Sequence, residues 1–403
     1  MNEGRRGSLR LLLIVQLTQN IRGGIISPIL ALFIRGHGLS VSQIGFLGIA
    51  GMLGWFIFEP LSGVVADRIR KKYMIIFAIV SSTVIYASYP MASSIWHFAV
   101  LAFFMSSVMS AYAVSVKAMT AELLPESDRG RTYGRYLSAI SMGGVVAPFI
   151  GGWVSANFGY TLPFYISASV GLVSLALVLL MRYDDKAPEN SKPLEESAKG
   201  EKLMTKPFIS ILVVRMIFMF NLLFRQNFLP IYLNESPNYQ ASETEIGAFM
   251  TVVRVTSALS QAVLGDLNDR FGSEIMIVGG VGLLGLSYLV MGYGSGDAIL
   301  YALAGVQGIL MAAANMSMMI HLMAIMPEGR TGMVMGFYSE AENVGGIVAS
   351  PALGVIYDSV GPLASLYTVT AILVLDAVLT MILIRRKAER SRDAAHEVQP
   401  VPQ

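Results

Sequence analysis

The stretch GVVADRIRKK, at residues 63–72, decides the fold, because a related stretch, GDLNDRFGSE, occupies residues 265–274. Its glycine, aspartate and first arginine return 202 positions later: Gly63, Asp67 and Arg68 as Gly265, Asp269 and Arg270. The same offset relates prolines and glycines further along each copy: Pro125, Gly130, Gly134, Gly143, Gly144 and Gly152 to Pro327, Gly332, Gly336, Gly345, Gly346 and Gly354. A repeat of about 200 residues is far too long for a solenoid unit, and in an apolar chain it predicts two equivalent membrane halves with a site between them.

Composition indicates that lipid surrounds most of the chain. Of the 403 residues, 54% are hydrophobic and 14% are charged, whereas about a quarter are charged in soluble domains. The chain contains no cysteine and only four histidines, which leaves little for a metal site. The net charge of +2 is too small to indicate a nucleic-acid partner. We find no nucleophile–base pair and no phosphate-binding glycine loop, so we expect neither an enzyme nor a bound cofactor.

Twelve apolar spans of roughly 19 to 30 residues follow one another, each long enough for a helix to cross about 30 Å of hydrocarbon. These spans lie near residues 9–33, 42–66, 74–92, 96–122, 132–156, 161–181, 208–233, 244–267, 275–293, 297–326, 331–356 and 362–384. The sequence therefore predicts an all-α membrane protein.

The positions of the basic residues predict the orientation. Twelve spans place both termini on one side, and outside the spans every lysine and arginine except Arg35 falls in the tails or the even-numbered connections. By the positive-inside rule, both termini are expected to be cytoplasmic. We expect the protein to lie in the plasma membrane. We expect an N-terminal bundle at residues 1–181, a polar cytoplasmic linker at 182–207, a C-terminal bundle at 208–385 and a cytoplasmic tail at 386–403.

The motif at residues 63–72 resembles the signature that follows the second helix in the major facilitator superfamily. Gly63, Asp67 and Arg68 match that signature, although Arg70 stands where the family has a glycine. The resemblance implies the family's fold, twelve transmembrane helices in two pseudo-symmetric six-helix bundles. It also implies that Asp67 caps the eleventh helix across the two halves, and that Glu122 lies near the basic residues of the loop. The gating residues that the resemblance implies are Gly63, Asp67, Arg68 and Glu122, together with Asp269 and Arg270 of the second copy.

A second motif, in the fifth span, is similar to the antiporter motif of the drug/proton branch of this superfamily. It consists of Gly134, Gly143, Ala147, Pro148, Gly151 and Gly152. Small residues at this spacing let helices approach closely, and Pro148 removes a backbone donor, so the segment is a seam at which helices pack and bend. Ala147 stands where the branch has a glycine, and Ala102 where it usually has an arginine in the fourth helix. The same spacing returns in the eleventh span, so the motif also fits general helix packing.

Ionisable residues inside the spans are the candidates for substrate binding and proton coupling, because each costs about 2.5 to 3.5 kcal/mol at mid-bilayer when it faces lipid. These candidates, with one neighbouring amide, are Arg22, Glu59, Lys117, Arg225, Arg254, Glu340, Glu342 and Asn343. Arg215 lies near a span end, where it can reach the surface, and we expect a structural role for it.

Three groupings of these candidates are expected from depth along the helices. Arg22 and Arg225 differ by 203 positions, one more than the repeat, so they lie at similar depth but about 100° apart in rotation. They either converge on an anion or pair locally. Glu59 and Lys117 also lie at similar depth and are expected to form a buried ion pair.

In the eleventh span, only one of Glu340 and Glu342 is expected to face the cavity, because they point about 200° apart. Glu340 is preferred, since it shares a helix face with Asn343, and Arg254 is its expected partner.

The resulting hypothesis is a monomeric secondary active transporter that works by alternating access. The leading function is the export of a small amphipathic organic compound in exchange for protons, driven by an ion gradient. One alternative is an organic-anion or organic-phosphate transporter that uses Arg22, Arg225 and Arg254. Another is a membrane sensor that no longer transports.

Overall fold

The computed structural model describes residues 3–66, 68–123, 144–181, 183, 204–326 and 331–397, and throughout these ranges the chain is predominantly helical. The first part of the chain forms α1 (Glu3–Ile26), α2 (Leu30–Gly36), α3 (Val41–Ala66), α4 (Lys71–Ser88), the short η1 (Tyr89–Met91), α5 (Ile95–Leu123), α7 (Ala147–Phe158) and α8 (Thr161–Leu180). The second part forms α9 (Lys206–Leu223), η2 (Phe224–Phe228), α10 (Leu229–Glu235), α11 (Glu243–Phe271), α12 (Ser273–Tyr293), α13 (Asp297–Ile325), α14 (Thr331–Val360) and α15 (Pro362–Glu397).

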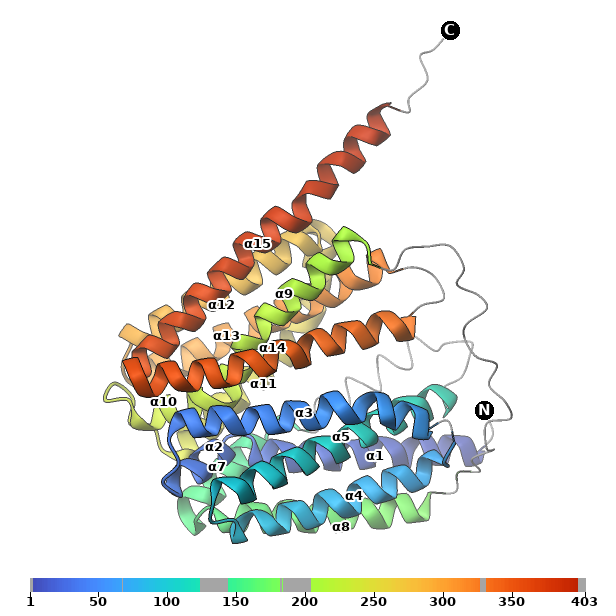
Figure 1. Cartoon of the computed structure of the whole chain (residues 1–403), viewed down its shortest axis with the longest axis vertical. Helices are drawn as coiled ribbons and strands as arrows, with labels where there is room; N and C mark the ends of the chain where they lie inside the picture. The colour runs from blue at the N-terminus through green and yellow to red at the C-terminus, as the bar shows by residue number, and fades with distance from the viewer. Residues whose placement is uncertain are drawn as a thin grey trace.

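Helices α1 to α8 lie together, and α9 to α15 lie beside them (Figure 1). We call these groups the first and second halves. Two helix pairs form most of the interface between them: α3 packs against α14, and α7 packs against α11. In Figure 1, α3 and α14 run side by side, so this part of the interface extends along the length of the helices.

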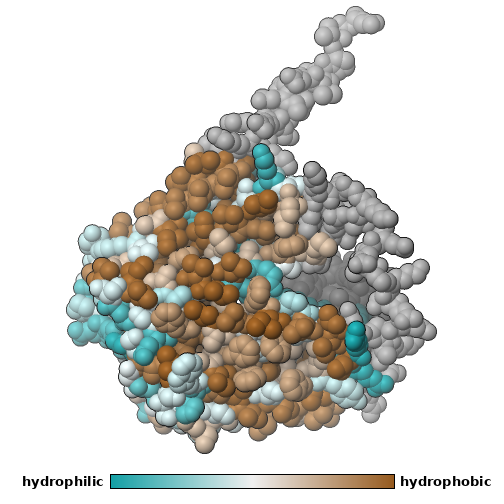
Figure 2. Space-filling model, in the orientation of Figure 1, coloured by the Kyte–Doolittle hydropathy of each residue, from teal (hydrophilic) through white to brown (hydrophobic). Residues whose placement is uncertain are grey.

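The composition of the helices explains why they sit in a bilayer. Within the described residues, ten helices are long and apolar enough to cross a membrane. Many large hydrophobic side chains remain exposed on them, and hydrophobic residues cover the middle of the face drawn in Figure 2, while hydrophilic residues gather near α10. An outer surface of this kind is suited to lipid rather than to water. Helix α14 occupies the predicted span 331–356, and α7 covers the last part of the predicted span 132–156, of which residues 132–143 lie outside the described residues.

Proline interrupts the first helix of each half at equivalent positions. The predicted span 9–33 is divided into α1 and α2 around Pro28, and the span 208–233 into α9, η2 and α10 just before Pro230. A proline lacks the N–H that would continue the helical ladder, so the helix breaks or widens there. In the second half the widening takes the form of a π-helix, which is η2. Each interruption places irregular backbone close to the interface between the halves.

Short connections link the helices at one end of the molecule, which we call the closed end. There Asp358 at the end of α14 accepts hydrogen bonds from the backbone N–H groups of Val41 (3.2 Å) and Ser42 (2.6 Å) at the start of α3. Arg35 and Glu235 form an ion pair of 2.7 Å across the halves. We call the opposite end, where α1 and α9 begin and α5 and α13 end, the linker end.

Candidate functional site

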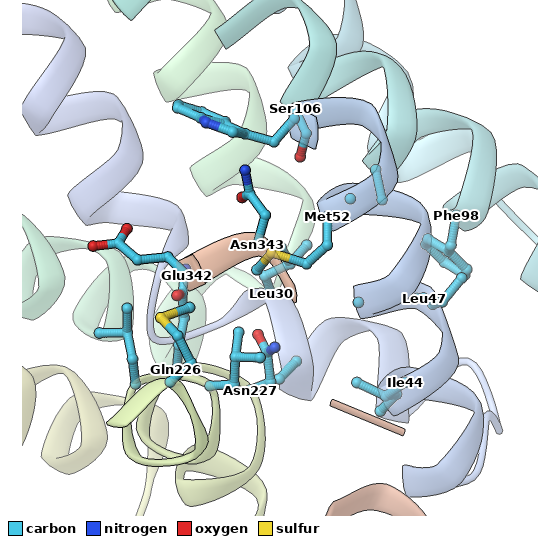
Figure 3. Close-up of a pocket in the computed structure, with 18 of the residues that line it drawn as sticks. Leu30, Ile44, Leu47, Met52, Phe98, Ser106, Gln226, Asn227, Glu342 and Asn343 are labelled. Carbon is cyan, nitrogen blue, oxygen red and sulfur yellow. The ribbon is translucent and has the colours of Figure 1, made fainter. Parts of the chain in front are cut away.

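A cavity of about 460 Å³ lies between the halves. Its walls come from α2, α3 and α5 of the first half and from α9, η2 and α14 of the second. Figure 3 shows Met52 and Asn343 in the middle of this cavity, with Gln226 and Asn227 of η2 on one side and Ser106 on the other. A mainly apolar wall with a few polar side chains is typical of a site for an amphipathic small molecule.

Glu59 connects the two halves across the cavity wall. Its Oε2 atom accepts a hydrogen bond of 2.7 Å from Trp55 Nε1 on the same helix and one of 3.1 Å from Ser339 Oγ on α14. Both donors use the same oxygen, so within the described residues Oε1 has no hydrogen bond. The carboxylate therefore keeps one oxygen available for a proton or a ligand, while the other holds the halves together.

Lys117 lines the same cavity as Glu59, but the prediction that the two form an ion pair is wrong. No contact within 4.0 Å joins the two charges, and Lys117 is exposed. It also borders a second hollow of about 330 Å³ that continues along α1 and α5 past Gln16 and Thr120. Equal depth was the basis for the expected pair, but Trp55 and Ser339 already bind the carboxylate of Glu59. The space around Lys117 extends toward the linker end.

On α14, Glu342 lines the cavity together with Ser339 and Asn343, whereas Glu340 does not. The expected preference for Glu340 is therefore wrong. Residues 339, 342 and 343 fall on one face of the helix, and this face is turned toward α3. Glu340 lies on the edge of that face, where it accepts a hydrogen bond of 3.3 Å from Asn343 Nδ2.

The partner of the cavity-lining glutamate is Arg215, not the expected Arg254. Arg215 contacts Glu342 Oε1 at 2.5 Å and 2.7 Å through two nitrogens and donates to Asn315 Oδ1 at 2.7 Å. Depth explains the difference: Arg215 and Glu342 lie about 14 and 16 Å from the linker ends of α9 and α14, whereas Arg254 lies about 25 Å from that end of α11. Arg215 is thus tied to the cavity wall instead of reaching the surface.

Arg22 is placed inside the first half and not beside Arg225. Its side chain is fully buried and donates to the backbone oxygen of Ser167 (2.8 Å), to Gln19 (2.8 Å) and to the hydroxyls of Ser82 (3.3 Å) and Thr83 (3.2 Å). Its guanidinium also stacks over the Tyr86 ring, 5.0 Å from the centroid. The rotation caused by the one-residue slip turns it toward α4 and α8, so the predicted convergence of the two arginines does not occur.

Arg225 and Arg254 lie closer to the closed end. Arg225 belongs to η2, and its Nε atom is buried without a hydrogen-bond partner. Arg254 on α11 donates to the backbone oxygen of Gly144 at 3.2 Å and contacts Ser27 Oγ at 3.5 Å.

The residues of the repeated signature lie at the linker end. Gly63 is on α3, Arg68 follows that helix, and Asp269 and Arg270 are in the last turn of α11. Glu122 forms an ion pair of 2.9 Å with Lys71, a basic residue of the loop. Asp67 lies outside the described residues, so its predicted contact with α14 remains a prediction.

Of the fifth-span motif, Ala147, Pro148, Gly151 and Gly152 lie at the start of α7, while Gly134 and Gly143 lie outside the described residues. A Cβ atom on Gly151 would clash with the carbonyl oxygen of Ile25 on α1, and one on Gly152 with that of Glu243 on α11. These glycines allow α7 to touch helices of both halves at the closed end.

The closed end contains cross-half contacts that the sequence did not reveal. Tyr160 of the first half donates to Glu243 of the second at 2.5 Å. Within the second half, Tyr357 donates at 3.2 Å to Glu235, which is the partner of Arg35 across the halves. Asp358 lies beyond the predicted span 331–356. Burial acts to raise its pKa, but the hydrogen bonds from Ser42 and Val41 lower it more, so the pKa of Asp358 stays below its usual value. This carboxylate is therefore charged at neutral pH, and its contribution is lost only as the pH falls through the lowered pKa. In the sequence, the one signal of contacts at this end was Arg35, because every other lysine and arginine outside the spans falls in a tail or an even-numbered connection.

Comparison with known proteins gives consistent matches. The profile described as Major Facilitator Superfamily matches residues 12–235 and 214–402. An uncharacterised MFS-type transporter of Methanocaldococcus jannaschii is 24% identical over 358 residues, which cover 87% of this chain and 90% of that protein. The quinolone resistance protein NorA of Staphylococcus aureus is 25% identical over 262 residues, 63% of this chain and 65% of NorA.

Solved structures share the fold. A bacterial homologue of the human lysosomal transporter Spinster superposes with a TM-score of 0.79 at 15% identity, covering 96% of this chain and 98% of that one. A POT family transporter in complex with 5-aminolevulinic acid gives a TM-score of 0.79 at 14% identity, covering 93% and 95%.

Proposed function

Because the chain belongs to the Major Facilitator Superfamily, and is a membrane transporter working by alternating access rather than an enzyme, we propose that it exports a small amphipathic organic compound in exchange for protons. We place it in the plasma membrane as a monomer, with both termini and the linker end on the cytoplasmic side. The substrate then enters the cavity from the cytoplasm and leaves after the closed end opens.

The observation that carries this proposal is the position of Glu59. Its carboxylate lines the cavity and at the same time accepts a hydrogen bond from Ser339 of the other half. A proton on Glu59 removes the negative charge that faces the substrate and changes the bond that joins α3 to α14. One group thus links proton binding, substrate binding and the relative position of the halves, which is what exchange requires.

The walls of the cavity support an amphipathic substrate. Leu30, Leu47, Met52 and Phe98 provide apolar surface, and the flexible methionine allows ligands of different shape to pack. The name of the relative NorA, a quinolone resistance protein, also supports efflux of an organic compound. The organic-anion alternative relied on Arg22 beside Arg225 and Arg254, and Arg22 lies elsewhere.

The test is proton movement in proteoliposomes that carry a pH-sensitive dye inside. We expect ethidium, an organic cation, to drive proton flux in the parent protein, and Glu59→Gln to reduce this flux at least about tenfold, because the glutamine cannot release a proton. Asp297→Asn, which neutralises an exposed carboxylate at the start of α13, is the matched control and is expected to retain the flux. Equal ethidium-driven flux in the parent and in Glu59→Gln would refute proton exchange through this residue, whereas no flux in either protein would favour a sensor.

A further inference from the structure

The hollow of about 330 Å³ between α1 and α5 adjoins the main cavity. Trp55 and Lys117 line both spaces, so a molecule in the main cavity can extend into the hollow. Along α5 the hollow runs from Met109 to Thr120, a length of about 16 Å. Lys117 lies about 9 Å from the linker end of α5, which is the end where the substrate enters in the proposed function.

The α1 side of this hollow is lined by amide side chains, namely those of Gln16, Gln19 and Asn20. Gln19 Oε1 accepts a hydrogen bond of 2.8 Å from Arg22. A guanidinium group only donates, so this bond fixes which end of the amide is oxygen and leaves the Nε2 atom as a donor. Within the described structure, that Nε2 atom is buried and has no hydrogen-bond acceptor. A ligand oxygen that reached it would satisfy a donor that is otherwise left unpaired.

The α5 side of the hollow supplies a positive charge. Of the described residues that line the hollow, Lys117 alone is charged. Its side chain is exposed, and it forms neither an ion pair nor a hydrogen bond with another described residue. Lysines within membrane spans that no carboxylate neutralises are typical of substrate pathways. The hollow therefore favours an anionic group.

The charges that line the main cavity differ in whether they are neutralised. Glu342 is paired with Arg215, whereas Glu59 keeps one oxygen without a hydrogen bond to any described residue. Glu59 and Lys117 lie about 10 and 9 Å from the linker ends of α3 and α5, yet they do not contact each other. Each of these two opposite charges is thus available to a different part of a ligand.

We propose that Lys117 binds a carboxylate of the exported compound, and that Gln19 Nε2 donates to an oxygen of the same compound inside the hollow. This inference rests on the proposed function and specifies its substrate class, an amphipathic compound that bears a carboxylate. An ammonium group binds a carboxylate through a charge-assisted hydrogen bond, which is stronger than a bond between neutral groups. Trp55 and Met52 of the main cavity contact the apolar body of the compound. Cations without a carboxylate, such as ethidium, use the Glu59 side of the cavity alone.

The test measures binding without transport. Thermal unfolding of the purified full chain in a neutral detergent is followed with 4-phenylbutanoate and with the uncharged 4-phenylbutanamide, at constant pH and ionic strength. We expect 4-phenylbutanoate to raise the unfolding temperature of the parent, and the amide to raise it much less at the same concentration. Lys117→Gln is expected to weaken 4-phenylbutanoate binding about tenfold or more, because the charge-assisted bond is lost. Lys117→Arg keeps the charge and is expected to retain most of the affinity.

Two further variants separate this site from a general charge effect. Gln19→Glu keeps an acceptor for Arg22 but replaces the donor with a carboxylate oxygen that repels the ligand, so it is expected to weaken binding as well. Lys206→Gln is the matched control, since it removes an exposed lysine at the start of α9 that lines neither space. It is expected to bind 4-phenylbutanoate like the parent. A Lys117 that served only to orient α5 in the membrane would leave this binding unchanged when replaced by glutamine.

Binding of 4-phenylbutanoate that is absent in the parent, or equal in the parent and in Lys117→Gln, would overturn the proposal. So would equal stabilisation by the carboxylate and the amide, because the charge would then play no part. Stabilisation by phosphatidylglycerol added to the micelles, without any by 4-phenylbutanoate, would overturn it too, because Lys117 would then hold a lipid headgroup. The proposed function is judged separately, by ethidium-driven proton flux that depends on Glu59. Either proposal can fail while the other stands.

Discussion

At the scale of single residues, the ion pair between Arg215 and Glu342 is the best-defined charge arrangement in the cavity wall. Glu342→Gln is expected to lower the free energy of unfolding by about 2 to 3 kcal/mol, because it leaves the charge of Arg215 with Asn315 as its hydrogen-bonding partner. This is less than for a fully buried pair, since the side chain of Glu342 is 30% exposed. Unfolding in detergent, monitored by intrinsic fluorescence, measures the loss.

A double-variant cycle supplies the control for this pair. Arg215→Gln combined with Glu342→Gln is expected to recover most of the stability lost in Glu342→Gln, because no unpaired charge remains. Strictly additive losses in the two single variants and the double variant would show that the charges do not interact.

Sequence reasoning at this scale placed residues in depth better than in rotation. Glu59, Lys117 and Asn343 were predicted near the cavity, and all three line it, whereas Glu340 was preferred to Glu342 and it is Glu342 that lines the cavity. Their partners were not predicted, because a partner depends on the rotation of each helix, and one residue turns a side chain by about 100°. Arg22 shows the effect most clearly, since its one-residue offset from Arg225 directs it into the first half.

At the scale of helices, α7 depends on Gly151 for its contact with α1. Gly151→Ala is expected to abolish or strongly reduce transport, because the added methyl group clashes with the backbone of Ile25 and separates the helices at the closed end. A cysteine introduced at Ala31, a buried residue of the cavity wall, reports this change by its rate of alkylation with an impermeant maleimide.

Gly279 on α12 provides the matched control, since a Cβ atom there meets nothing within 4 Å. Gly279→Ala is expected to retain both transport and the slow alkylation of the cysteine at residue 31. The same slow alkylation in Gly151→Ala would contradict the role of α7 in closing this end.

The sequence predicted the helices themselves from their apolar length, but not where they are interrupted. Spans 9–33 and 208–233 were each expected as one helix, and both are divided near a proline, Pro28 or Pro230. Pro60 and Pro351, in contrast, lie inside continuous helices. A proline thus permits a break, and the packing around it decides whether the break occurs.

At the scale of the whole molecule, the repeat and the apolar spans were sufficient to predict the fold, because both are properties of long stretches of sequence. The contacts that close one end were not predictable in this way. Asp358 and Ser42 are far apart in the chain, and they meet only after α3 and α14 have packed. The repeat predicts that equivalent helices exist, whereas the conformation adopted by the two halves is decided by a few polar contacts at the end of the interface.

The ion pair between Arg35 and Glu235 offers a direct test of whether that end must open for transport. The chain contains no cysteine, and the two side chains are 36% and 33% exposed, so cysteines at these positions are accessible without background. A partly exposed ion pair contributes at most about 1 kcal/mol to stability. The variant that combines Arg35→Cys with Glu235→Cys is therefore expected to transport normally before treatment. A short bifunctional thiol reagent is then expected to stop ethidium-driven proton flux, and a reductant to restore it, because the cross-link holds the halves together. Single-cysteine variants treated in the same way are expected to keep their flux. Undiminished flux in fully cross-linked protein would mean that this end stays closed during transport and that the substrate leaves by another route.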